Sequence, residues 1–208
     1  TLNPSYADAY LLRGQVYTSV GNTPAAISNF SQVLELAPES TEAYYGRGKA
    51  YLLTSDQQAA VTDFTAAIAR NPDHAPSYKG RGDAFANQGN ATNALGDYTT
   101  AIALDGAYWD AYASRGRLHY ETGSYQEAYA DFSTVIATGS YQEAYADFST
   151  VIAANVFDPD VFYYRGVTNA LLGNVGGAEM DLEKAGSLYL TNNEAARYRI
   201  VLDALSKL

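Results

Sequence analysis

Two histidines, no cysteine and a surplus of carboxylates are the groups from which this sequence could build a catalytic or metal site. A protein metal site brings several imidazole, thiolate or carboxylate ligands together. His74 and His119 lie far apart in the chain, with no second His or Cys beside either, so we predict no metal and no cofactor. The sequence has no Ser-His-Asp pattern, no nucleophile elbow and no phosphate loop, and Gly173–Gly177 is expected to form an ordinary turn. We therefore predict that the chain is not an enzyme.

Arginine and aspartate recur at a spacing that favours structural ion pairs over catalysis. The dipeptide Arg-Gly occurs five times, and an Asn or Asp follows each of these arginines by 16 residues. An arginine at a half-buried helix interface needs a partner, because an unpaired buried charge costs several kcal/mol. The first unit should form a weaker Arg13–Asn29 hydrogen bond. The expected ion pairs are Arg47–Asp63, Arg81–Asp97, Arg115–Asp131 and Arg165–Asp181.

The charge balance limits the classes of partner. The chain carries 13 Lys and Arg against 23 Asp and Glu, a net charge of -10. The basic residues are spread evenly, which argues against a phosphate-binding stripe and hence against nucleic acid. No apolar run is long enough to predict a membrane span. The absence of cysteine excludes disulfides but does not assign a compartment.

The elements that carry these residues repeat with a fixed period. Successive Arg-Gly dipeptides are separated by 34, 34, 34 and then 50 residues. A period of this length is typical of stacked repeat units. Each unit contains two apolar-periodic stretches separated by a short break, which predicts a pair of antiparallel helices. In the first unit Thr23 and Pro24 should cap and open the second helix, and Pro38 should end it.

The repeated positions resemble those of the tetratricopeptide-repeat (TPR) family. The first unit carries them at Tyr10, Arg13, Gly14, Tyr17, Ala26, Phe30, Val33 and Pro38. The resemblance implies an all-α fold, a right-handed superhelical solenoid of antiparallel helix pairs, interrupted by one duplicated helix. We expect residues 1–208 to form a single array: repeats at 7–40, 41–74, 75–108 and 109–138, a duplicated second helix and linker at 139–158, a fifth repeat at 159–192 and a capping helix at 193–208.

The irregular interval contains a tandem duplication. Gly123–Thr138 is followed at once by Gly139–Ala154, and 15 of the 16 residues are identical, which indicates a recent or engineered duplication. The array offers one slot for two copies, so we expect an ejected copy or a rearranged C-terminal part. The chain should break at Gly139, although one continuous helix is the alternative, and Arg115 should reveal the docked copy by pairing with Asp131 or Asp147. Each copy carries an apolar stripe: Ala128, Phe132, Val135 and Ile136 in one, and Ala144, Phe148, Val151 and Ile152 in the other.

The resemblance also implies where a partner binds. In this family the first helix of each unit lines a concave groove that receives a peptide or a partner protein. The side chains used to hold a C-terminal carboxylate are missing, because Gln15, Gly46 and Gly80 stand at three of those positions. The function expected is a non-catalytic interaction scaffold. The alternatives are a structural module that forms homodimers through residues 125–154, and an accessory domain of a larger enzyme. The groove residues expected to contact a partner are Tyr45, Lys49, Lys79, Asp83, Arg117, Tyr120, Tyr163 and Tyr164.

Overall fold

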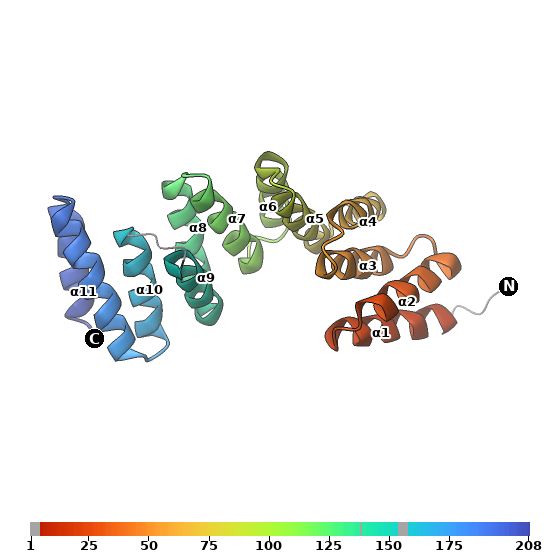
Figure 1. The fold of residues 1–208 in the computed structure, drawn as a ribbon, viewed down its shortest axis with the longest axis horizontal. Coiled ribbons are helices and arrows are strands. Elements are labelled where there is room, and N and C mark those ends of the chain that lie inside the picture. The colour runs from red at the N-terminus through yellow and green to blue at the C-terminus, as the bar shows by residue number, and fades with distance from the viewer. Residues whose placement is uncertain (1–4, 138, 154–157) are drawn as a thin grey trace. The chain divides into compact units, whose positions relative to one another are not determined.

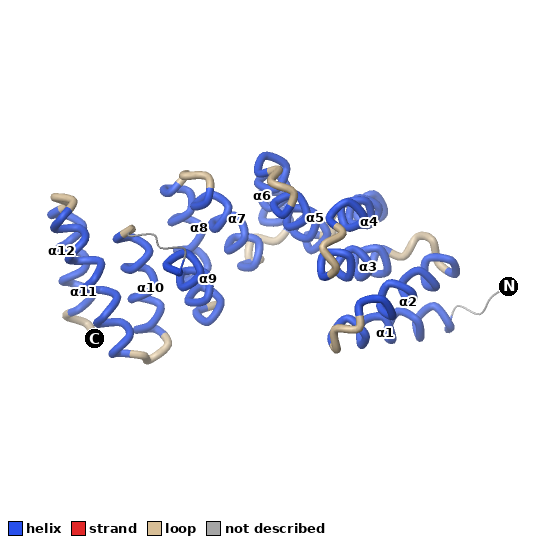
Figure 2. The backbone as a smooth tube through the Cα atoms, viewed as in Figure 1, coloured by secondary structure: helices blue, strands red, loops and turns tan. Residues whose placement is uncertain are grey.

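The computed structural model describes residues 5–137, 139–153 and 158–208, which form twelve α-helices and no strand (Figures 1 and 2). Within the described residues, short turns join successive helices. No helix among the described residues is long and apolar enough to cross a membrane. The helices are α1 Ser5–Ser19, α2 Thr23–Leu36, α3 Thr41–Leu53, α4 Gln57–Arg70, α5 Ala75–Asn87, α6 Ala91–Leu104, α7 Trp109–Glu121, α8 Tyr125–Ala137, α9 Tyr141–Ala153, α10 Pro159–Leu171, α11 Val175–Thr191 and α12 Ala195–Leu205.

Short polar side chains start the second helix of several pairs. The side chain of Asn22 accepts a hydrogen bond from the amide of Ala25 at 3.3 Å, and Asp56 does the same for Ala59 at 3.1 Å. These bonds satisfy amides that have no partner within the helix. The cap of α2 is therefore Asn22, and the predicted cap Thr23 is instead the first helical residue. The Asn side chain reaches the exposed amides from one position earlier.

Glycine in the left-handed region ends several first helices. Gly21, Gly89 and Gly173 have φ of 76°, 74° and 76°, values that residues with a side chain rarely adopt. The duplicated segment carries its own copy of this turn, because Gly123 and Gly139 have φ of 81° and 83°. Consequently α8 ends at Ala137 and α9 starts at Tyr141, so the chain breaks rather than continuing as one helix. Thr138 and the predicted linker residues 154–157 lie outside the described residues.

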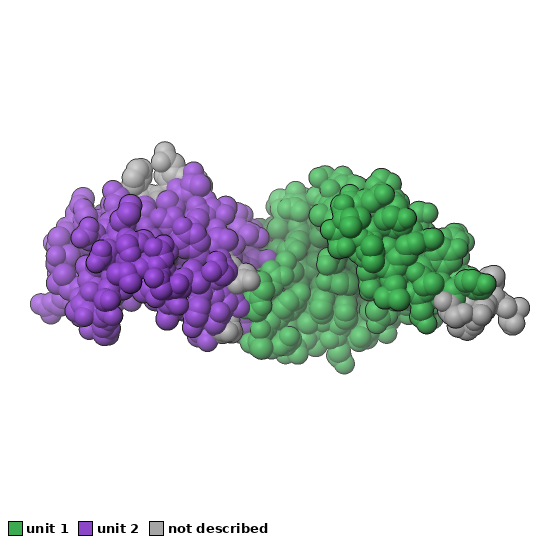
Figure 3. All heavy atoms as spheres, turned by 90° about the horizontal axis from the view of Figure 1, so that it is seen from below, with its two compact units in different colours: residues 1–111 green, residues 112–208 purple. Residues whose placement is uncertain are grey.

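The chain divides into two compact units, Thr1–Ala111 and Tyr112–Leu208 (Figure 3). In unit 1, α1 packs against α2 and α3 against α4, while α2 and α4 also contact α3 and α5 respectively. The second helices α2 and α4 therefore each contact two first helices. In unit 2, α10 packs against α11 and α9, and α12 covers α11.

A single phenylalanine fills the contacts that α2 and α4 each make with the first helices on both sides. Phe64 is fully buried, and a Cβ placed on Gly48 or Gly80 would lie 3.0 Å or 2.5 Å from its ring. Real Cβ atoms do not approach an aromatic ring so closely, so glycine is needed for the helices to meet. Phe30 stands in the same relation to Gly14 and Gly46, at 2.7 Å and 2.6 Å.

The four predicted Arg–Asp contacts are present in the structure, between the first and second helices of one pair. The shortest nitrogen–oxygen distance is 2.7 Å for Arg47–Asp63, Arg115–Asp131 and Arg165–Asp181, and 2.8 Å for Arg81–Asp97. Both Nε and Nη2 of each arginine donate to the carboxylate. Arg13 donates to Asn29 at 2.6 Å. The aspartates are buried, so these bonds compensate the desolvation of the charges.

The two copies of the duplicated helix occupy different positions in unit 2. Copy one, α8, pairs with α7 through Arg115 and Asp131, and its Phe132 fills the space beside Gly116. Copy two, α9, faces α10, where Arg165 donates to Ser149 at 3.4 Å. Neither copy is ejected, and α10 and α11 keep the pairing of an ordinary repeat. The expectation of a single available slot is therefore wrong, because each copy takes one of the two interfaces that a second helix normally serves.

Candidate functional site

A hollow of about 440 Å³ lies between α1 and α3 in unit 1. On α3 its wall is formed by residues spaced three, four and seven positions apart, which places them on one face of the helix. Two of the predicted groove residues, Tyr45 and Lys49, belong to this wall. We call it the α1–α3 hollow, and its lining residues are Gln15, Thr18, Ser19, Phe30, Glu42, Tyr45, Gly46, Lys49 and His74.

The floor of the α1–α3 hollow consists of Gly46 and the ring of Phe30. A Cβ on Gly46 would lie 2.6 Å from the Cε1 and Cζ atoms of that ring. Phe30 itself is 1% exposed and cannot yield without disturbing the core. Glycine therefore leaves the floor free of a side chain, and an apolar surface lies beneath whatever enters.

Two aromatic rings form the wall at Tyr45. Its ring meets that of His74 edge to face at a centroid distance of 5.1 Å, and it lies 5.9 Å from Phe64. Burial raises the pKa of Tyr45 above its ordinary value, against the opposing charge of Lys79. Burial also lowers the pKa of His74, whose Nδ1 lies 2.7 Å from the hydroxyl of Ser77. Both rings are therefore uncharged at neutral pH and held in place by neighbours.

Lys49 differs from the other predicted groove cations. Its ammonium lies 5.5 Å from the centroid of the Tyr45 ring, and it forms no salt bridge with a described residue. Lys79, by contrast, lies 2.9 Å from Asp83 and 3.1 Å from Asp110. The Tyr98 hydroxyl donates to Asp83 at 3.0 Å. Lys79 and Asp83 thus form part of an internal ion cluster, and Lys49 is the cation that the hollow presents to a ligand.

The groove residues predicted on α7 have other contacts in unit 2. Arg117 donates to Asp147 of α9 at 3.2 Å. Tyr120 is 8% exposed and lies in the core cluster with Phe132 and Phe148. The prediction that Tyr120 forms a groove wall is therefore corrected. The inserted α9 extends the core over this part of α7, and a buried side chain cannot contact a partner.

The last two predicted groove residues lie at the other end of unit 2. Tyr164 stacks on Phe148 at a centroid distance of 6.0 Å, and Tyr163 meets Tyr164 at 5.3 Å. Tyr163 also lines a hollow of about 400 Å³ between α10 and α12, with Asp203 and Lys207 among its other residues. Within unit 2, Tyr163 therefore faces a hollow formed with α12, whereas Arg117 and Tyr120 contact the inserted α9 or the core around it.

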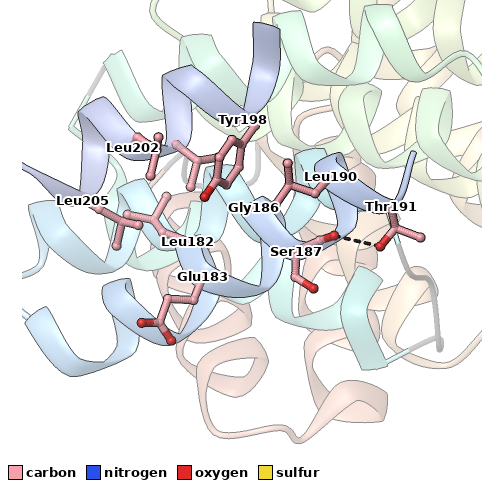
Figure 4. Close-up of a pocket in the computed structure, with 10 residues that line it drawn as sticks. Leu182, Glu183, Gly186, Ser187, Leu190, Thr191, Tyr198, Leu202 and Leu205 are labelled. Carbon is pink, nitrogen blue, oxygen red and sulfur yellow. Dashed lines mark hydrogen bonds between the residues drawn. The ribbon is translucent and has the colours of Figure 1, made fainter. Parts of the chain in front are cut away.

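A further hollow of about 570 Å³ lies between α11 and α12 (Figure 4). Leucine side chains of both helices and the ring of Tyr198 line it, and Thr191 donates to the backbone carbonyl of Ser187 at its edge. Leu190 and Leu202 are 54% and 47% exposed. No lysine or arginine is among the residues that line this hollow, in contrast to the α1–α3 hollow with Lys49.

Sequence reasoning did not find three features of these sites. His74, for which the sequence indicates no ligand role, forms a wall of the α1–α3 hollow. Asp110 joins Lys79 from the following first helix. Asp160 accepts hydrogen bonds from Tyr189 and Arg197, which ties α12 to α10. These partners are 29 to 37 residues apart in the chain, and only the repeat period could have suggested their proximity.

Comparison with known proteins agrees with this architecture. A family model described as tetratricopeptide repeat matches residues 11–76, 58–107 and 79–138. No curated protein matches the chain in sequence.

Several solved structures share the fold. The MamA protein superposes with a TM-score of 0.61 at 19% identity, covering 93% of this chain and 95% of its own. YrrB, described as a TPR protein with an unusual peptide-binding site, gives 0.57 at 22% identity, covering 96% and 91%. The first TPR of Spaghetti (RPAP3), solved bound to the HSP90 peptide SRMEEVD, gives 0.56 at 20% identity, covering 58% and 96%. At these identities the likeness establishes the fold.

Proposed function

The chain belongs to the tetratricopeptide-repeat family of non-catalytic interaction scaffolds, and on that premise we propose that it binds a peptide segment of a partner protein in the α1–α3 hollow. The proposal rests on one observation: residues that the family uses for binding are also residues that line the hollow. The residues that the family places on its binding face include Gln15, Tyr45 and Lys49, and the same residues line the hollow.

The chemistry of the hollow suits a peptide. Tyr45 provides rigid contact area that loses little side-chain entropy on binding. The hydroxyls of Thr18 and Ser19 donate to backbone carbonyls of α1 and can accept from a peptide N–H, and the Gln15 amide can both donate and accept. Lys49 and Glu42 supply charge. Two structural neighbours, YrrB and the RPAP3 domain, are described with a peptide site or a bound peptide, which supports the same class of partner here.

Selection from a library of short random peptides displayed on phage tests the proposal. Ser19→Trp would fill the hollow from an exposed position without removing a core side chain. Selected peptides should bind this variant at least about tenfold more weakly than the parent chain, which corresponds to 1.4 kcal/mol. Ser28→Trp is the matched control, because Ser28 is exposed on α2 and does not line the hollow. Equal binding to both variants, or no selected peptide, would contradict the proposal.

Self-association through residues 125–154 is the alternative with a definite test. It has less support, because Ala128, Phe132, Ala144 and Phe148 are all fully buried in one core cluster of unit 2. These residues of the two apolar stripes are thus covered within one chain. Light scattering should give a monomer for this chain and for a version lacking residues 139–154. A dimer formed only by the chain with both copies would favour self-association. An accessory role in a larger enzyme would instead be sought in the flanking sequence.

A further inference from the structure

The α1–α3 hollow carries opposite charges at two points of one helix face. Glu42 and Lys49 are both exposed, and they stand seven residues apart on α3. Seven residues of an α-helix rotate close to a whole number of turns and advance about 10 Å along the axis. Neither residue forms a salt bridge with a described residue. The two charges therefore remain available to a ligand.

The groups around the hollow leave Glu42 and Lys49 with opposite charges. His74 lies close enough to Glu42 for the carboxylate to act on it, but burial lowers the pKa of His74 and keeps the ring neutral at pH 7. The cluster of Lys79, Asp83 and Asp110, which acts electrostatically on Tyr45, has one more acidic than basic group. Neither neighbour neutralises Glu42. Between the charges lie Tyr45, Gly46 and the ring of Phe30, which form an apolar surface.

We propose that the α1–α3 hollow selects an extended peptide with an acidic and a basic residue about three positions apart and an apolar or aromatic side chain between them. The acidic residue pairs with Lys49 and the basic residue with Glu42. An extended chain in the polyproline II conformation advances about 3.1 Å per residue with three residues per turn, so side chains three positions apart share one side and cover about the distance between the two charges. A helical ligand would need seven residues for the same distance. This inference rests on the proposed peptide-binding function and specifies its ligand.

Single charge reversals test the proposed selectivity. Phage selection from a random peptide library would be repeated with Lys49→Glu and with Glu42→Lys. We expect peptides selected by Lys49→Glu to carry two basic residues about three positions apart, and those selected by Glu42→Lys two acidic residues at that spacing. Synthetic peptides selected by the parent chain should bind each variant about tenfold more weakly. Because both positions are exposed, neither change should alter the far-ultraviolet circular dichroism spectrum.

The matched controls are Lys184→Glu and Glu179→Lys on α11, which make the same charge changes at exposed positions outside the hollow. They should select the same peptides as the parent chain. Peptides that are blocked by Ser19→Trp but keep their charges with Lys49→Glu and Glu42→Lys would overturn this inference and leave the proposed function standing. A charge spacing of seven would overturn the extended conformation. Failure to select any peptide blocked by Ser19→Trp would overturn both proposals.

Discussion

Second helices in both units pack against the first helices beside them, but unit 2 uses two copies of a helix where unit 1 uses a single helix. In unit 1 a single helix, α4, gives Asp63 to Arg47 of its own pair and Thr65 to Arg81 of the next, at 2.7 Å and 3.3 Å. In unit 2 these two contacts are divided between two helices. The aspartate that meets Arg115 belongs to α8, whereas the serine that meets Arg165 belongs to α9.

The phenylalanines follow the same division. Phe64 touches the glycine of its own pair and the glycine of the next, whereas Phe132 lies against Gly116 and Phe148 stacks on Tyr164. Tyr164 occupies the repeat position that is Gly80 in unit 1. A second helix of this array thus has two separable interfaces, and a duplication can give each interface its own helix.

Removal of the shared phenylalanine should have the largest effect. Phe64→Ala is expected to lower the free energy of unfolding by about 4 kcal/mol, because its fully buried ring fills space at two junctions. Phe132→Ala should cost roughly half as much, since the adjacent copy carries an identical stripe that can take over the contact with α7. Urea unfolding followed by circular dichroism, with hydrogen exchange to locate the affected helices, measures both values.

The double variant Phe132→Ala with Phe148→Ala tests whether one copy takes over the contact of the other. It removes both rings and should lose at least as much stability as Phe64→Ala. Equal losses for Phe64→Ala and Phe132→Ala would show that α9 cannot replace α8.

The arginines should show the next largest difference between the units. Arg47→Ala is expected to cost about 3 kcal/mol, because it leaves the carboxylate of Asp63, 3% exposed, without its charged partner. Arg117→Ala should cost less than about 1 kcal/mol, since its side chain is 41% exposed and its bond to Asp147 is longer at 3.2 Å. Chemical denaturation of the two variants gives the comparison.

A second substitution separates the lost bond from the stranded charge. Arg47→Ala combined with Asp63→Asn should be more stable than Arg47→Ala alone, because no buried carboxylate remains unpaired. If the double variant were less stable than the single one, the cost of Arg47→Ala would lie in packing of the arginine stem.

Glycine at the inter-repeat contact should have an intermediate effect. Gly80→Ala places a Cβ 2.5 Å from the Cζ atom of Phe64 and is expected to destabilise the chain by about 2 kcal/mol. Gly96→Ala is the control on α6, where a new Cβ meets nothing within 4 Å. It should stabilise by about 0.5 to 1 kcal/mol, because alanine loses less entropy in a helix. Thermal unfolding midpoints that rise for both variants would contradict the packing assigned to Phe64.

The smallest effect concerns His74 and pH. Burial holds its pKa in the folded chain below the ordinary value, so the unfolded chain binds more protons just below neutrality. Stability should therefore fall as pH decreases through the ordinary histidine range, from about pH 7 to pH 5. His74→Gln should flatten this part of the stability profile, measured by urea unfolding at several pH values. An unchanged slope in the variant would mean that His74 titrates equally in both states.

Much of the fold could be predicted from the sequence because the same pattern of residues occurs in five units, and each unit supports the same interpretation. The 34-residue period indicated helix pairs, and Arg and Asp 16 residues apart indicated the ion pairs. The site was predicted less completely. The repeat positions of Tyr45 and Lys49 predict that both lie in a groove, but those positions do not reveal which cations are already paired. Lys79 meets Asp110 from the next first helix, a contact that depends on how helices of different repeats approach.

The sequence by itself determined where helices begin and end and which side chains face their partners, because caps, left-handed glycines and the 3.6-residue period act over one or two turns. Only the tertiary structure decided where each of the two copies packs and that Tyr120 is buried. The copies are nearly identical in sequence, so no local preference distinguishes them. Their different positions follow from the competition of α7 and α10 for the same apolar stripe, which long-range packing resolves by giving each first helix a copy of its own.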